Sequence, residues 1–196
     1  MSSRIDELDA IVGQFDLNNH PFYVEWRAGT LPVERLAEYA DEWAPFIGVV
    51  DQGWDRLGYA DYAAEEREHD ALWQQFRSAL GASSAMRRPQ SKTLLAVGEN
   101  AFASVPESLG ALYSFEVQQP TTASSKLAGL REHYAGTVGT DAQRYFVEHA
   151  AETDEPAMLA GLIDGLSDEA FARVKTACAL FSAAAWGALD GVYFTD

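Results

Sequence analysis

Apolar residues recur every three or four positions along most of this chain, which is the spacing that lines one face of an α-helix. The clearest run follows Pro32 and predicts a long core helix bent at Pro45, because a proline inside a helix removes a backbone donor. No segment shows the strict alternation of a half-buried strand, so the pattern predicts an all-α fold. The apolar positions of the clearest run are Val33, Leu36, Tyr39, Trp43, Phe46, Ile47 and Val50.

Further helices are predicted on both sides of this run. Asp141 is expected to cap a helix that carries His149 and ends before Pro156, and Ser167 is expected to cap the last helix. We therefore predict one domain over residues 1–196, built as a bundle of about seven or eight helices. The other predicted helices are residues 3–16, a short helix from His20 to Gly29, and residues 60–80, 93–104 and 106–134.

The net charge of the chain is −16, which restricts its partners. Nucleic acid and anionic membranes would be repelled, so we expect neither as a partner and predict a small-molecule substrate instead. No apolar run approaches the roughly 18 residues that span a bilayer, and the N-terminal MSSRIDELDAIV does not resemble a signal peptide. These features predict a cytoplasmic protein. The one cysteine, Cys178, lies in an apolar helical stripe, where we expect a small buried side chain rather than a nucleophile.

Glu116 is the strongest chemical signal in the residues themselves. It lies in ALYSFEVQQP, beside apolar Leu112 and Phe115, where an ionised carboxylate is costly to bury unless it is paired or bound to a metal. Pro120 follows four residues later, and we expect the helix to bend there.

Three other positions could join Glu116 in a metal site made of carboxylates and imidazoles. Glu65 and His69 are four residues apart, and hence on one helix face, and Glu66 at three residues is an equivalent choice. His149 would come from a third helix. The alternative is that Glu65 and His69 lie on a solvated face, since they belong to a run of charges, and that His149 is a histidine of the core.

Four stretches of this chain resemble the heme-oxygenase-like diiron oxidases, and within them the chlamydial death-domain-associating protein family. The resemblance covers most of the chain and implies a heme-oxygenase-like helical bundle with one or two iron ions, manganese being the alternative metal, and dioxygen as co-substrate. The stretches are ALYSFEVQQP with SSKLAGLREHY, HPFYVEWRAGTLPVERLAEYA, EEREHDALWQQFRSALG and WGALDGVY.

The resemblance also assigns metal ligands. The family histidine ahead of a Leu-Trp pair falls on His69, the glutamate of its YxxExQ motif on Glu116, and the first histidine of its HxxxDxxH motif on His149.

Three expected ligand positions depart from the family pattern. The chain has Tyr62 where the family has a glutamate, so Glu65 is the predicted substitute one turn nearer to the histidine. It has Thr153 and Pro156 where the family has aspartate and histidine, and on a regular helix these two would share a face with the preceding histidine. Glu152 is the predicted substitute for the lost aspartate.

Tyr23 and Lys126 form a second group. The resemblance implies that this tyrosine and lysine supply the carbon and nitrogen of para-aminobenzoate, a folate precursor, from the protein itself. Lys126 is ten residues beyond Glu116, which is about 15 Å along a straight helix, so a bend at Pro120 would be needed to bring the two groups together. Phe115 stands where the family suggests a further tyrosine.

Three functions therefore remain open. The first is an iron-dependent oxidase or oxygenase acting on a small amine, an amino-acid-derived substrate or its own Tyr23. The second is a cofactor-free enzyme of the pyrroloquinoline-quinone synthase or thiaminase type, although a thiaminase needs a cysteine nucleophile. The third is a binding protein that has lost its metal ligands. A homodimer is expected by analogy with the family.

Overall fold

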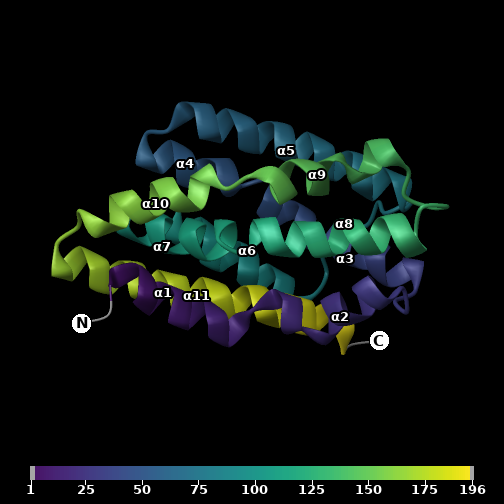
Figure 1. The fold of residues 1–196 in the computed structure, drawn as a ribbon, viewed down its shortest axis with the longest axis horizontal. Helices are drawn as coiled ribbons and strands as arrows, with labels where there is room; N and C mark the ends of the chain where they lie inside the picture. The colour runs from purple at the N-terminus through teal and green to yellow at the C-terminus, as the bar shows by residue number, and fades with distance from the viewer. Residues whose placement is uncertain (1–2, 195–196) are drawn as a thin grey trace.

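The computed structural model describes residues 3–194, and every regular element in this part of the chain is a helix (Figure 1). The predicted all-α bundle is confirmed, although it contains more helices than expected because several predicted helices are divided. The helices are α1 (Arg4–Val12), α2 (Pro21–Ala28), α3 (Val33–Ile47), α4 (Val50–Leu57), α5 (Ala60–Ala79), α6 (Pro89–Ala101), α7 (Val105–Glu116), α8 (Gln119–His133), α9 (Arg144–Ala151), α10 (Asp154–Asp164) and α11 (Asp168–Tyr193), with 3₁₀ turns at Gly13–Phe15, Leu17–Asn19 and Thr140–Gln143.

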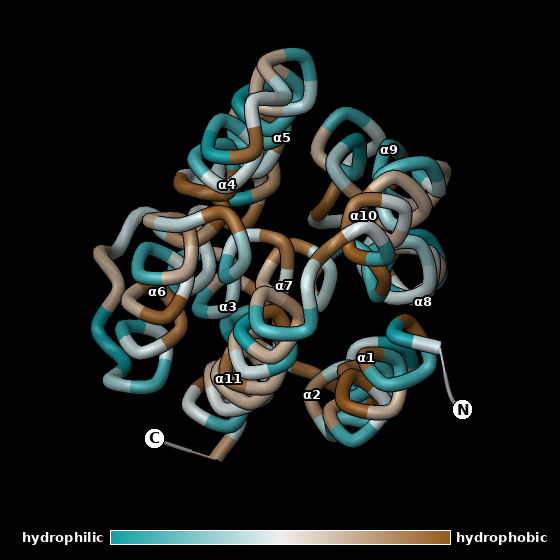
Figure 2. Tube along the Cα trace, turned by 90° about the vertical axis from the view of Figure 1, so that its left-hand side faces the viewer, coloured by the Kyte–Doolittle hydropathy of each residue, from teal (hydrophilic) through white to brown (hydrophobic). Residues whose placement is uncertain are grey.

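Helix α7 lies in the middle of the bundle, with the other helices around it (Figure 2). It packs most extensively against α11, and also against α4 and α10. Gly110 makes the contact with α11 close, since a Cβ atom there would lie 2.2 Å from the backbone oxygen of Val174. This packing fixes the last residue of α7, Glu116, at the centre of the molecule.

Two of the predicted long helices are broken. The run after Pro32 divides at Gly48 into α3 and α4, while Pro45 is accommodated within α3. The segment expected to bend at Pro120 divides two residues earlier, and Pro120 lies in the first turn of α8, where no backbone donor is required. The chain therefore changes direction directly after Glu116.

The helix of His149 is also shorter than expected, and the reason is Pro156. In a continuous helix, residue 156 would donate its backbone N–H to the carbonyl of residue 152, and proline has none. The helix therefore ends at Ala151, Glu152 is extended (φ −74°, ψ 124°), and α10 begins at Asp154 with Pro156 in its first turn. This break between α9 and α10 shifts the side chains that follow it.

Asp141 does not cap the helix of His149 as predicted, because it lies within the 3₁₀ turn Thr140–Gln143 and no side chain caps α9. Other helix starts agree better with the sequence. His20 caps α2 by accepting a hydrogen bond from the backbone N–H of Phe22, and the Ser167 side chain caps α11 in the same way from Ala170. Cys178 is buried, as predicted. Among the helices that the structure describes, none combines the length and apolar character needed to cross a lipid bilayer.

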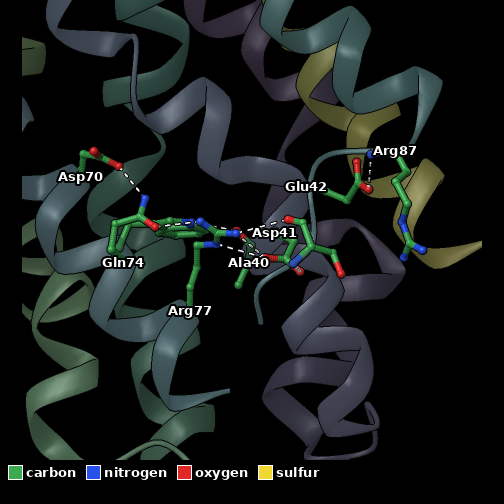
Figure 3. Close-up of polar contacts among 9 residues, drawn as sticks. Ala40, Asp41, Glu42, Asp70, Gln74, Arg77 and Arg87 are labelled. Carbon is green, nitrogen blue, oxygen red and sulfur yellow. Dashed lines mark hydrogen bonds and ion pairs between the residues drawn. The ribbon is translucent and has the colours of Figure 1, made fainter. Parts of the chain in front are cut away.

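Two buried carboxylates of α3 show how this fold normally treats such groups (Figure 3). Asp41 accepts hydrogen bonds from the guanidinium of Arg77 at 2.5 and 3.1 Å and from a backbone N–H at 2.9 Å. Glu42 accepts from the backbone N–H groups of Arg87 and Arg88 at 2.8 and 3.1 Å. These bonds anchor the loop between α5 and α6, and they satisfy both carboxylates, as burial requires.

Candidate metal centre

Six side chains with metal-binding atoms converge beside the end of α7. Ligand atoms of Glu66, His69 and His149 lie within 4.8 Å of one another, and so do ligand atoms of Glu66, Glu116 and Glu155. The two groups share Glu66, so they form one continuous cluster from four helices. Its members are Glu66 and His69 of α5, Glu116 of α7, His149 of α9, Glu155 of α10 and, between the last two helices, Glu152.

Glu152 joins the cluster through both imidazoles. Its carboxylate oxygens lie 3.2 Å from Nε2 of His69 and 3.9 Å from Nε2 of His149. The Nδ1 atom of His149 lies 2.9 Å from the backbone oxygen of Tyr145, which orients the ring so that Nε2 points into the cluster.

The donors of this cluster are buried, and most of them have no partner. Five of its residues are at most 6% exposed, and only the side chain of Glu152 is more open, at 23%. Eleven buried side-chain nitrogen or oxygen atoms in the described part of the chain lack a hydrogen-bond partner, and seven belong to this cluster. The seven are Oε1 of Glu66, Nδ1 of His69, both carboxylate oxygens of Glu116, Nε2 of His149, Oε2 of Glu152 and Oε1 of Glu155.

Unpaired buried acceptors are unusual, and Asp41 and Glu42 show that this fold can satisfy buried carboxylates when it only needs them for structure. A cluster of inward carboxylates, several of whose oxygens have no hydrogen-bond donor, is instead typical of a site that is completed by a cation.

The pKa values of the carboxylates are consistent with this interpretation. Burial and the neighbouring carboxylates raise the pKa of Glu116 well above its usual range. Burial also raises the pKa of Glu66, and it raises that of Glu155 to about 8, with further contributions from Glu66 and Glu152. These carboxyl groups are too close together to be ionised at the same time, so in the metal-free protein some of them keep their protons. A divalent cation would replace those protons and allow the carboxylates to ionise.

The pKa values of the two histidines are shifted in opposite directions. Burial alone would lower the pKa of His69, but hydrogen bonds to Glu152 and Glu66 raise it to about 10. Burial, and secondly the charge of His69, lower the pKa of His149 to about 3. His149 is therefore a neutral imidazole near pH 7, which is the form that binds metals.

In the metal-free protein, the free energy of unfolding should fall as the pH rises from about 5 to 8. The pKa of Glu155 is about 8 in the folded protein, whereas a glutamate in the unfolded chain has its ordinary value of 4.5. Between these two pH values only the folded state retains the proton. This stabilisation is complete below pH 4.5 and is lost as the pH rises through 8. Glu155→Gln should therefore be more stable than the parent at pH 8, by up to about 4 kcal/mol, and about equally stable near pH 5.

Urea unfolding of chelator-treated protein at several pH values measures this difference. Glu65→Gln, at an exposed position, is the control and should follow the parent protein at every pH. A difference between Glu155→Gln and the parent that does not change with pH would contradict the expectation.

The donor set fits a pair of first-row transition metals. Four carboxylates and two imidazoles, with a Glu-x-x-His pair formed by Glu66 and His69, are the donor types that four-helix carboxylate proteins use for two iron or manganese ions. Hard oxygen donors with a few imidazoles suit these metals better than copper or a structural zinc ion, which favour nitrogen and sulfur.

Tyr23 and Lys126 meet elsewhere in the same core. The Nζ atom of Lys126 lies 4.8 Å from the ring centre of Tyr23 and 5.4 Å from that of Phe146. The Tyr23 hydroxyl is 2.9 Å from that of Tyr39. Trp26, one turn after Tyr23, donates a hydrogen bond to the backbone oxygen of Lys126 at 3.2 Å and so links α2 to α8. The tyrosine and the lysine are thus in contact and both buried.

Burial changes the chemistry of both groups. It lowers the pKa of Lys126 to about 7, so a large fraction of this lysine is a neutral, nucleophilic amine near pH 7. It raises the pKa of the Tyr23 phenol, which therefore keeps its proton.

Tyr145 connects the two groups of residues. Its ring lies against that of His149, with ring centres 4.2 Å apart. It also lines a small cavity of about 10 Å³ together with Tyr23, Tyr39 and Lys126. That volume holds about one water-sized molecule. Tyr145 therefore contacts the cluster and also lines the cavity beside the Tyr23–Lys126 pair.

The chain was compared with known proteins, and the similarities extend over the segments that carry both the cluster and the Tyr23–Lys126 pair. No protein-family model matches the chain. The 4-aminobenzoate synthase of Chlamydia muridarum is 29% identical over 95% of this chain and 88% of its own length. The 4-aminobenzoate synthase of Nitrosomonas europaea is 28% identical, over 95% of this chain and 89% of its own. The resemblance to 4-aminobenzoate-forming proteins is confirmed. It extends over almost the whole chain.

Solved structures of TenA homologues share the fold. One from Pseudomonas syringae pv. tomato gives a TM-score of 0.79 at 12% identity, covering 98% of this chain and 93% of its own. One from P. horikoshii gives 0.69 at 14% identity, covering 98% and 99%. At such identities the likeness supports the helical architecture and not a shared reaction.

The structure does not bring one predicted ligand, Glu65, into the cluster. Glu65 is exposed on the outer face of α5, whereas Glu66 is buried within the cluster, so Glu66 takes the place predicted for Glu65. The structure does bring together the other predicted metal ligands, which are His69, Glu116, His149 and Glu152.

Glu155 was missed, and its position follows from the break at the end of α9. Thr153 and Pro156 do not face the cluster as they would on a regular helix, because the helix restarts at Asp154 and turns Glu155 inward instead. Pro156 itself was the available signal. Tyr62, at the remaining family ligand position, stacks on Trp54 and has no part in either group of ligand atoms.

Proposed function

We propose that this chain is a metal-dependent, oxygen-using enzyme that forms 4-aminobenzoate from its own Tyr23, with Lys126 as the source of nitrogen. The observation that carries the proposal is the buried contact between Lys126 Nζ and the Tyr23 ring, in the same core as six converging metal donors. The name of the similar proteins from Chlamydia muridarum and Nitrosomonas europaea, 4-aminobenzoate synthase, supports it.

The carbon skeleton of the product agrees with a tyrosine precursor. In 4-aminobenzoate the carboxyl carbon stands para to nitrogen, and in tyrosine Cβ stands para to the hydroxyl oxygen. Tyr23 would thus supply the ring and, after cleavage of its Cα–Cβ bond, the carboxyl carbon. The nitrogen of Lys126 would replace the phenol oxygen, which would leave as water, and the Cε–Nζ bond of the lysine would break. Conversion of a methylene carbon into a carboxylate is an oxidation, so dioxygen is the expected co-substrate.

The six donors would hold the metal, which we propose to be iron, with manganese as the alternative. When bound there, the metal would supply dioxygen activation and electron transfer. The residues around Tyr23 would do the rest. They exclude bulk water from the ring, hold its hydroxyl against Tyr39, and lower the pKa of Lys126 so that a large fraction of its amine is neutral at the ring face near pH 7.

Isotope labelling tests this function. The protein is produced with ring-labelled tyrosine, freed of metal, loaded with iron(II) without oxygen and then exposed to air. We expect labelled 4-aminobenzoate in mass spectra, at no more than one molecule per chain, because the precursor is consumed. Production with ¹⁵N-lysine should label the amino group. Unlabelled product, or product in excess of the chains, would contradict the proposal.

The alternatives predicted from the sequence have less support. A cofactor-free enzyme needs a cavity for an organic substrate, and the cavity beside Tyr23 and Lys126 is only about 10 Å³. Burial also raises the pKa of Cys178 to about 12, so it is no thiolate nucleophile. A binding protein that has lost its ligands was suggested by Tyr62, Thr153 and Pro156, but Glu66, Glu152 and Glu155 supply carboxylates in their place.

A further inference from the structure

The metal cluster is closed except at the break between α9 and α10. Glu152, at this break, is the one donor of the cluster with a substantially exposed side chain, at 23%, and it still reaches both imidazoles. A cation that arrives from solvent therefore meets Glu152 before any other donor. The orphaned atoms of His149 and Glu155 lie behind it.

The break between α9 and α10 has no side-chain cap. Glu152 and Thr153 belong to neither helix, and the Thr153 side chain does not cap α10. The helices that meet there are short, with α9 eight residues long and α10 eleven. Segments with few local hydrogen bonds open at a lower free-energy cost than the core.

One contact crosses from α5 to this break. The hydroxyl of Tyr62 donates a hydrogen bond to the Asp154 carboxylate at 3.3 Å, and Asp154 is the first residue of α10. The Tyr62 ring is itself fixed by stacking on buried Trp54, with ring centres 4.8 Å apart and planes 19° apart. In Figure 1, α9 runs beside α5, against which it packs, and α10 continues from it, so this contact ties α5 to the start of α10 at the break.

The charges around the contact attract cations. Asp154 and Glu65 are exposed, and both lie near enough to Tyr62 to raise its pKa, after the effect of its partial burial. Asp61 is exposed one residue away. Carboxylates that surround an opening raise the local concentration of divalent cations.

We propose that metal ions reach the cluster through the α9–α10 break and that the Tyr62–Asp154 contact controls how fast they pass. This inference rests on the proposed function for the presence of the metal. It adds the path by which the metal enters, and it assigns a role in metal entry to Tyr62, which is not a ligand. The contact acts on the opening of the break and leaves the bound state unchanged, so uptake and release change together.

Cobalt(II) uptake by the chelator-treated full chain tests the proposal, since bound cobalt is followed by its visible absorption without any turnover. Tyr62→Phe removes the hydroxyl alone and should speed both uptake and chelator-driven release about threefold, as expected for loss of one partly exposed hydrogen bond. Tyr62→Ala also removes the ring and should speed both about tenfold. The final stoichiometry, spectrum and affinity should equal those of the parent.

Two controls separate the contact from its surroundings. Tyr59→Phe changes a neighbouring tyrosine whose ring touches that of Tyr62, and it should leave both rates unchanged. Asp154→Asn keeps an oxygen acceptor but removes a charge, so it should slow uptake without speeding release. Unchanged rates in both Tyr62 variants, or equal acceleration by Tyr59→Phe, would overturn this proposal alone. Absence of bound metal in the parent protein would overturn the proposed function instead.

Discussion

Tyr23→Phe should reduce the yield of 4-aminobenzoate at least about a hundredfold while leaving the metal content unchanged. Phenylalanine fills the same space in the core, so the fold should be retained. It lacks the oxygen that Lys126 nitrogen would replace, and it is much harder to oxidise than a phenol. The measurement is product mass spectrometry on metal-loaded protein, with metal analysis of the same sample.

Tyr134→Phe is the matched control for this prediction. Tyr134 is also a buried tyrosine, and its hydroxyl donates to the backbone oxygen of Leu31 at 2.9 Å, away from the cluster and from Lys126. This variant should form product in normal yield. If Tyr23→Phe forms product as well as Tyr134→Phe does, Tyr23 is not the precursor, and the metal-dependent reaction must use another substrate.

Glu66→Ala should weaken metal binding at least about a hundredfold, more than the usual effect of a residue that only supports a ligand. Glu66 belongs to both groups of ligand atoms, so its loss removes a donor from each side of the cluster. Anaerobic titration with iron(II) or cobalt(II), followed by metal analysis after desalting, measures the affinity and the stoichiometry.

Glu65→Ala gives a control one residue away on the same helix. Its side chain is exposed, so metal binding should equal that of the parent. Equal metal binding in Glu65→Ala and Glu66→Ala would remove the basis for the cluster as a metal site.

The sequence predicted the helical bundle and much of the cluster for identifiable reasons. Helical periodicity is strong in this chain, and Glu116 was recognisable as a carboxylate in an apolar segment. The choice between Glu65 and Glu66 could not be made from the sequence. Both spacings to His69 place a carboxylate near the imidazole, and only the rotation of α5 in the packed bundle decides which one points inward.

Glu155 could not be found under the assumption of a regular helix. Pro156 was read as a missing ligand, although its main effect is on the backbone. It ends α9, and the restart of α10 brings Glu155 into the cluster. A proline close to a ligand motif therefore changes which residues of the motif face the metal.

The contact between Tyr23 and Lys126 is a tertiary contact, which the helical periodicity of the sequence cannot predict. A straight helix would have placed Lys126 about 15 Å beyond Glu116. The break at Val117 and Gln118 redirects α8 alongside α2, and Gly129 permits the approach, since a Cβ there would lie 2.8 Å from the backbone oxygen of Trp26.

The complete burial of Tyr23 has a consequence for the life of each molecule. A chain that gives up this ring is left with a hole among its aromatic side chains, and loss of a buried aromatic group costs about 3–5 kcal/mol. Native domains are stable by only about 5–15 kcal/mol. Used copies would therefore unfold more readily than fresh ones and become preferred targets for proteolysis. The tight packing that keeps water away from Tyr23 and Lys126 would therefore also make each chain that has reacted more susceptible to degradation.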